Sequence, residues 1–195
     1  MPTARTPAKP RESQRLDETH WIEAALDLLA ASGVDAVRVE PLARTLGVTK
    51  GSFYWHFKDR ADLLERMLGA WRRRATARII ERLDQEPDRD AEWRLRRLAD
   101  LPRDGARAER GANLELAIRL WAKRDTAAAA AIAEIDKQRL DYITQLMRRP
   151  DANPEDAGAR AFLFYAYLLA EAFLAKDTRA DYDTMLSVLL NRPVG

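Results

Sequence analysis

The chain has 195 residues, of which 47% are hydrophobic and 33% charged, so its composition is that of a globular protein rather than a disordered one. The formal net charge is only +2, which excludes a polycation that coats nucleic acid by bulk charge; any such contact must come from a local basic patch. There is no cysteine, and the two histidines, His20 and His56, are far apart in sequence. This excludes disulfide scaffolds, thiol nucleophiles and cysteine-ligated zinc, and we expect neither a metal nor a cofactor.

No run approaches the 18 or more apolar residues of a membrane-spanning helix, and the N-terminus has no apolar signal core. We therefore expect a soluble, cytoplasmic protein without a membrane partner. Residues 1–16 combine prolines with basic side chains and few apolar ones, which predicts a flexible basic arm. The alternative for this segment is a disordered tail without a role.

Beyond the arm, prolines and glycines fall between segments with helical periodicity, and no stretch alternates apolar and polar residues for long. The first helix illustrates the pattern, because Ile22, Ala25, Leu26 and Leu29 share one face and Asp17 can cap its start. The sequence thus predicts an all-α fold of about nine helices. Their expected ranges are 18–31, 39–46, 50–57, 60–84, 91–101, 112–123, 126–149, 154–176 and 182–191.

The second and third of these helices are short and are joined by a tight turn at Gly47 and Val48, which is the helix-turn-helix pattern. Phe53 and Phe57 are four residues apart and are expected to pack inward. Residues 44–60 carry a local charge of +3, from Arg44, Lys50, Lys58 and Arg60 against Asp59, where a DNA duplex would need it. The alternative is a buried aromatic hairpin with solvated lysines.

The stretch RTLGVTKGSFYWHFKDRADL, residues 44–63, resembles the DNA-binding segment of the tetracycline-repressor (TetR) family, and the specific match covers about residues 18–68. The resemblance implies that Lys50 lies in the major groove, that Tyr54 and His56 contact phosphates, and that Lys58 and Arg60 add charge contacts. The chain departs from the family at residues 38–41, because the small hydroxyl residue that usually caps the second helix is absent. Glu40 would face DNA poorly there unless it accepts a hydrogen bond from a cytosine amino group. The expected DNA-binding residues are Arg38, Thr49, Lys50, Gly51, Ser52, Tyr54, Trp55, His56, Lys58 and Arg60.

The resemblance also divides the chain into a helix-turn-helix DNA-binding domain at 17–65 and a larger helical ligand-sensing and dimerisation domain at 66–195. The helix at 154–176 is apolar nearly all round, which independently favours a homodimer; the alternative is that it forms the central core. The expected interface residues are Phe162, Tyr165, Leu169, Phe173, Met185 and Leu189. Aromatic and nearby side chains on helices that would surround a pocket are candidates for ligand binding, although core packing alone would also explain them. These are Trp71, Trp93, Asn113, Leu116, Trp121 and Tyr142.

Together these observations predict a transcriptional regulator, a repressor that a small-molecule effector releases from a palindromic operator. The alternative is a helical small-molecule-handling enzyme whose basic loop binds an anionic substrate. That alternative lacks a nucleophile, a metal set and a glycine-rich phosphate loop in the sequence.

Overall fold

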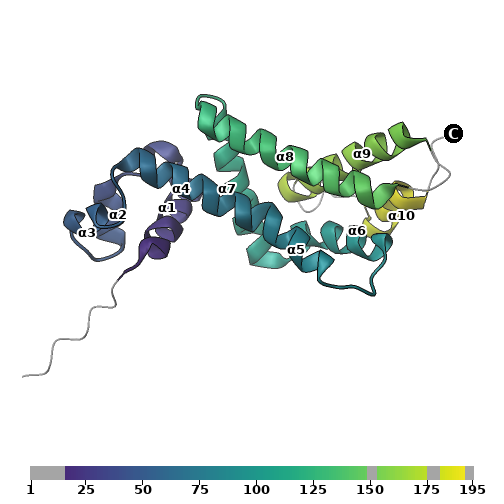
Figure 1. Cartoon of the computed structure of the whole chain (residues 1–195), viewed down its shortest axis with the longest axis horizontal. Helices are drawn as coiled ribbons and strands as arrows, with labels where there is room; N and C mark the ends of the chain where they lie inside the picture. The colour runs from purple at the N-terminus through teal and green to yellow at the C-terminus, as the bar shows by residue number, and fades with distance from the viewer. Residues whose placement is uncertain (1–15, 149–152, 175–180, 192–195) are drawn as a thin grey trace, which may run out of the picture.

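The computed structural model describes residues 16–148, 153–174 and 181–191, and over these ranges the chain is helical and has no strand, in agreement with the all-α prediction. Residues 1–15 of the expected arm lie outside the described part. The N-terminal helices form one end of the molecule and the others gather at the opposite end (Figure 1). The helices are α1 (Glu18–Ser32), α2 (Val39–Thr45), α3 (Lys50–Tyr54), α4 (Arg60–Arg72), α5 (Arg78–Asp84), α6 (Ala91–Asp100), α7 (Gly105–Ala122), α8 (Thr126–Met147), α9 (Pro154–Phe173) and α10 (Tyr182–Asn191).

The N-terminal domain is built around buried aromatic rings. Trp21 of α1 meets Phe53 of α3 edge-on with ring centroids 5.4 Å apart, and Phe53 stacks on Phe57 at 5.1 Å. All three side chains are buried, which confirms the inward packing predicted for the two phenylalanines. Burial of each of these rings is worth about 1.5–3 kcal/mol, so they fix α3 against α1.

The cap predicted at Asp17 is confirmed, and helices α4 and α8 start in the same way. The side chains of Asp17, Asp59 and Asp125 each accept a hydrogen bond from a backbone N–H in the first turn of the helix that follows. Thr49 occupies the cap position of α3, but its side chain makes no capping hydrogen bond. Its hydroxyl therefore has no structural use at the helix start.

Helices α4 and α5 are the two ends of one continuous helical rod, residues 60–84, which the sequence predicted as a single helix. A π-helical segment, Arg73–Ala77, interrupts the α-helical hydrogen bonding in the middle of the rod. The rod begins in the N-terminal domain and ends among the C-terminal helices (Figure 1). The predicted domain boundary at residues 65–66 falls inside it.

Helix α7 starts at Gly105, seven residues before the predicted start at residue 112. The sequence prediction was wrong because it took Gly105 and Gly111 as breaks. Gly111 is exposed and makes no close contact, and a glycine inside a helix costs only about 1 kcal/mol, which the surrounding alanines, arginines and glutamate tolerate. The longer helix places residues 104–111 beside the cavity described below.

Two hydrophobic cores hold the chain together. The first joins α1–α4 to α7 and α8, because Ile118, Trp121 and Ile135 pack with Trp21 and the other N-terminal core residues. The second joins α5, α6, α8, α9 and α10, with Phe164 and Leu186 at its centre. Among the helices of the described ranges, none has the length and apolar character needed to cross a bilayer.

Candidate nucleic-acid interface and ligand cavity

The turn between α2 and α3 sets the angle between these helices. Gly47 has φ = 68°, a left-handed conformation that a side chain would strain. Its N–H bonds to Arg44 O at 3.2 Å, and the N–H of Val48 bonds to Ala43 O at 2.9 Å, so the turn is tied back onto α2. This is the predicted turn of a helix-turn-helix.

The outer face of α3 is basic and aromatic. Phe53 is fully buried, whereas Tyr54 is 62% exposed and Trp55 is 88% exposed. Lys50 and Lys58 are also exposed at the two ends of this face. The Trp55 ring is thus in solvent and is not packed against the neighbouring helices.

The remaining predicted DNA contacts around α3 divide by exposure. Thr49 and Gly51 are exposed, and Ser52 and His56 are half-buried. We define the outer face of α3 as the following residues: Thr49, Lys50, Gly51, Ser52, Tyr54, Trp55, His56 and Lys58.

Two charged residues before α3 have internal partners. Glu40 on α2 forms an ion pair with Lys50, and this hydrogen bond is the main cause that lowers the pKa of the Glu40 carboxyl. Arg38 is exposed and donates from Nε to the carbonyl of Asp35 at 2.9 Å, and its other N–H groups remain available. Glu40 therefore aligns Lys50 rather than standing alone on the face.

Arg60 has a structural use that the sequence did not reveal. Its Nε donates to Val37 O at 2.6 Å and its Nη2 donates to Val34 O at 2.7 Å. The guanidinium thereby ties the start of α4 to the loop after α1. The phosphate contact of Arg60 stays a prediction, and because its guanidinium is engaged inside the protein, Arg60 is left out of the outer face of α3.

Replacing Arg60 with alanine is expected to destabilise the protein by about 1.5–3 kcal/mol, since two partly buried carbonyls lose a charged donor. Urea unfolding measures this loss as a lower midpoint. The salt dependence of DNA binding should keep its parental slope, whereas a slope reduced by about one unit would restore Arg60 to the phosphate-binding set.

A cavity of about 560 Å³ lies within the C-terminal helices and reaches α1. Its inner wall is apolar and includes Leu98, Ile143, Leu168 and Trp71. The volume lies within the range of about 300–1,000 Å³ that is usual for small-molecule sites. The cavity is therefore large enough for an effector.

Two of the six predicted ligand residues line this cavity. Trp71 forms part of the buried wall of the cavity. Tyr142 also lines the cavity, and its hydroxyl donates to Asp84 Oδ1 at 3.0 Å. Burial, followed by this hydrogen bond, raises the pKa of Tyr142 to about 12, so its hydroxyl remains a neutral donor at physiological pH.

The other four predicted ligand residues do not line the cavity. Trp121 is buried in the N-terminal core, and Trp93 lies against the Arg89 guanidinium instead. Asn113 and Leu116 are exposed, because the cavity side of α7 is formed by their neighbours Leu114 and Glu115. Residues 112–122 are helical as predicted, but the side of this helix that lines the cavity differs from the predicted side.

A cluster of charged side chains in the cavity wall was missed by sequence reasoning. Arg139 on α8 holds Glu115 on α7 through two hydrogen bonds of 2.9 and 3.0 Å. Arg119 bonds to the same carboxylate at 2.8 Å and to Asp136 at 2.6 Å, and Tyr165 donates to Asp136 at 2.6 Å. Glu115 and Arg119, spaced four apart on α7, were the available signal, but their further partners Asp136 and Arg139 lie on α8.

Burial raises the pKa of the Glu115 carboxyl, but the nearby charges and hydrogen bonds of Arg139 and Arg119 outweigh this and lower it below its ordinary value. The carboxylate therefore stays ionised although only 12% of the side chain is exposed. The cluster as a whole carries two positive and two negative charges and is neutral.

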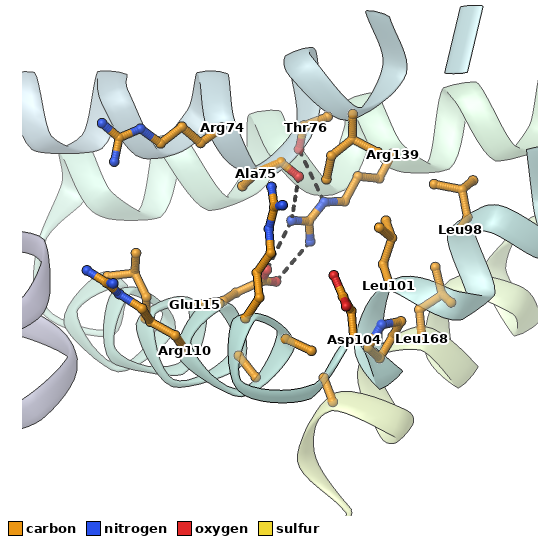
Figure 2. A pocket seen from close by; sticks show the side chains of 18 of the residues that line it. Arg74, Ala75, Thr76, Leu98, Leu101, Asp104, Arg110, Glu115, Arg139 and Leu168 are labelled. Atoms are coloured by element: carbon orange, nitrogen blue, oxygen red, sulfur yellow. Dashed lines mark hydrogen bonds and ion pairs between the residues drawn. The ribbon is translucent and has the colours of Figure 1, made fainter. Parts of the chain in front are cut away.

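Arg139 also contacts the π-helical segment (Figure 2). Its Nε donates to Thr76 Oγ1 at 3.2 Å and its Nη2 to Ala75 O at 3.2 Å. The same guanidinium thus joins the cavity wall to the middle of the rod that leads to the N-terminal domain. Ala75, Thr76, Glu115 and Arg139 all line the cavity.

The predicted interface residues separate into two groups. Phe162 is 62% exposed, as an interface requires, whereas Phe173 is 42% exposed and also lines the cavity. Tyr165 is buried in the charged cluster and Leu169 lines the cavity, so the structure gives these two an internal place that differs from the expectation. Met185 and Leu189 are half-buried against the C-terminal core.

We define the α9–α10 face by its exposed apolar residues, which are Phe162, Leu163, Phe173, Leu174 and Val188.

A glycine turn that holds a short helix with an exposed basic and aromatic face defines the N-terminal domain as a helix-turn-helix domain of the DNA-binding class. The model of the bacterial regulatory proteins of the tetR family matches residues 22–67. Over these residues, which are less than half of the chain, the protein is similar to that family.

Known proteins resemble the chain in two ways. The class A tetracycline repressor protein of Escherichia coli is 34% identical over 107 residues, which are 50% of this chain and 46% of the repressor. The chain thus spans about half or less of the length of the curated relatives it matches. A transcriptional regulator from Rhodococcus sp. Rha1 has a TM-score of 0.69 at 21% identity, over 90% of this chain and 94% of that one. AibR, solved with isovaleryl coenzyme A and operator DNA, has a TM-score of 0.64 at 17% identity, over 91% and 98%. At these identities the structures share the fold.

Proposed function

We propose that the protein is a sequence-specific, DNA-binding transcriptional regulator, a repressor that a small-molecule effector releases from a palindromic operator. The observation that carries this proposal is the outer face of α3, which combines exposed lysines, a tyrosine and a tryptophan on a helix fixed from behind by Phe53. Few other partners suit such a face, since the major groove admits one α-helix and offers phosphates on both sides.

The residues of the face have separate tasks in the complex. Lys50, aligned by Glu40, enters the major groove at the start of α3, where a lysine can donate to a guanine edge. Tyr54, His56 and Lys58 contact the phosphates and set the position of the helix without reading sequence. Arg38 adds a phosphate contact at the start of α2.

A homodimer would supply the second half of the operator contact. The α9–α10 face leaves large apolar side chains in solvent at the end of the molecule opposite α3 (Figure 1). Pairing of two such faces would bury them in a two-fold helical interface. The two copies of α3 then contact successive major grooves about 34 Å apart.

Release by an effector requires that the cavity and α3 are mechanically connected. The rod of residues 60–84 provides the connection, because its middle lines the cavity and its start is tied to the DNA-binding domain by Arg60. An effector that favours a different position of the rod would lower DNA affinity by its differential binding energy. AibR, which carries a ligand and operator DNA on the same fold, gives a precedent for this arrangement.

The enzyme alternative assigned an anionic substrate to the basic stretch 44–60. No residue of that stretch lines the 560 Å³ cavity, and the carboxylate inside the cavity is held by two arginines. No feature of the described residues therefore favours catalysis over DNA binding.

Charge removal at α3 tests the DNA-binding proposal. Lys50→Ala is expected to weaken binding to the preferred operator by about tenfold and to change the preferred sequence. Lys58→Ala should weaken binding to all sequences similarly and reduce the salt slope by about one unit. Fluorescence titration with operator and random duplexes measures both. Lys123→Ala removes an equal charge from an exposed site outside this face and serves as the control. Parental binding by both Lys50 and Lys58 variants would overturn the proposal.

A further inference from the structure

The charges around the cavity are distributed unevenly. Its exposed charged lining residues come from α1, α5, α6 and the region of α7, and they are Asp27, Arg82, Arg97, Asp104, Arg107 and Arg110. Four arginines against two aspartates give an excess of +2, equal to that of the whole 195-residue chain. The exposed part of the cavity is therefore the positively charged part, while the inner wall is apolar except for the neutral cluster around Glu115 and Arg139.

The charged residues of the inner wall are already satisfied. An arginine has five N–H donors, and Arg139 uses all of them, on Thr76, Tyr165, Ala75 and both oxygens of Glu115. The inner cluster is neutral and cannot bind a charged group without losing its own hydrogen bonds. A charged part of a ligand must then be bound at the exposed residues.

Two of the four exposed arginines are available for a ligand. Arg110 is paired with Asp27 and Arg97 with Asp100 at 3.2 Å. Arg82 on α5 and Arg107 on α7 form no hydrogen bond or ion pair within the described ranges of the chain. These two guanidiniums come from two different helices, and both line the same cavity.

We infer that the effector of this cavity is an amphipathic anion, which places its apolar body against Leu98, Ile143 and Leu168 and its carboxylate or phosphate at Arg82 and Arg107. The inference rests on the proposed ligand-responsive function. Arginine suits both head groups because its planar donors match their oxygens. Asp104, also exposed and unpaired in the described part, is the residue that a cationic ligand would use instead.

Three probes with the same ten-carbon chain test the inference: decyl phosphate, 1-decanol and decyltrimethylammonium, each below its micelle concentration, with decanoate to compare the two anions. Isothermal titration of the full chain gives each affinity. We expect decyl phosphate or decanoate to bind at least about tenfold more tightly than the alcohol and the cation. Equal or tighter binding of decyltrimethylammonium, or no binding of any probe, would overturn the inference.

The double variant Arg82→Ala/Arg107→Ala should lose the preference for the anion and keep the affinity for 1-decanol. Arg78→Ala/Lys123→Ala removes the same charge from exposed positions on α5 and just after α7 that do not line the cavity, and it should bind like the parent. Loss of anion preference in both variants would show that overall charge is responsible and would contradict the inference. Operator binding is measured separately and tests the proposed function. Failure of the ligand inference can therefore be distinguished from failure of the proposed function.

Discussion

Replacing Phe162 with glutamate is expected to convert the protein to a monomer and to weaken its binding to a two-half-site operator by at least about 100-fold. Phe162 is 62% exposed and belongs to the apolar α9–α10 face, where a glutamate buried opposite its symmetry mate would have no cation to pair with. The loss of affinity follows because the second α3 no longer binds at the high effective concentration that the dimer provides.

Sedimentation velocity measures the oligomeric state and fluorescence anisotropy the operator affinity. Leu120→Glu is the matched control, since Leu120 is also 62% exposed but lies on α7, outside the α9–α10 face. This control should remain dimeric. A dimer that persists in Phe162→Glu and in Leu163→Glu would refute the α9–α10 interface.

Glu115→Gln is expected to destabilise the protein by about 3–5 kcal/mol, because it removes one charge from a buried ion-pair network and leaves Arg139 and Arg119 with an excess of positive charge. The side chain of Glu115 is only 12% exposed, so solvent screens this interaction little. Urea unfolding gives the free energy. Glu134→Gln breaks the exposed pair with Arg72 and should cost no more than about 1 kcal/mol. Similar losses in the two variants would contradict the importance of the cluster.

The same network predicts an acid-labile contribution to stability. Burial opposes ionisation of Glu115, but Arg139 and Arg119 lower its pKa below the ordinary value of 4.5. A carboxyl whose pKa is lower in the folded state stabilises the fold above its unfolded pKa, and this stability is lost as pH falls through the folded value. The parent should therefore lose stability below about pH 4.5 more steeply than Glu115→Gln, as measured by urea unfolding at a series of pH values. Parallel pH profiles would contradict the assignment.

Local signals in the sequence were sufficient for the N-terminal domain. The glycine turn, the spacing of Phe53 and Phe57 and the Asp17 cap act within a few residues, and each of them has the predicted structural role. The use of Arg60 was missed because its acceptors, Val34 O and Val37 O, are more than twenty positions away.

Ligand and interface residues depend on which side of a helix faces which neighbour, and this is a tertiary property. Leu116 and Glu115 are adjacent in sequence, yet only Glu115 lines the cavity. Tyr165 was assigned to the interface because α9 is apolar all round, but its hydroxyl belongs to a charged cluster whose members come from α7 and α8. The π-helical segment at 73–77 likewise has no local sequence signal, because its contact with Arg139 spans more than sixty positions.

Selection of binding sites from random DNA duplexes tests most directly the claim that two outer faces of α3 read an operator together. The account predicts enrichment of a palindrome whose half-sites are separated by about one helical turn, 10–10.5 base pairs, and a different half-site for Lys50→Ala. Recovery of no preferred sequence, of a site without two-fold symmetry, or of the same half-site with Lys50→Ala would contradict it.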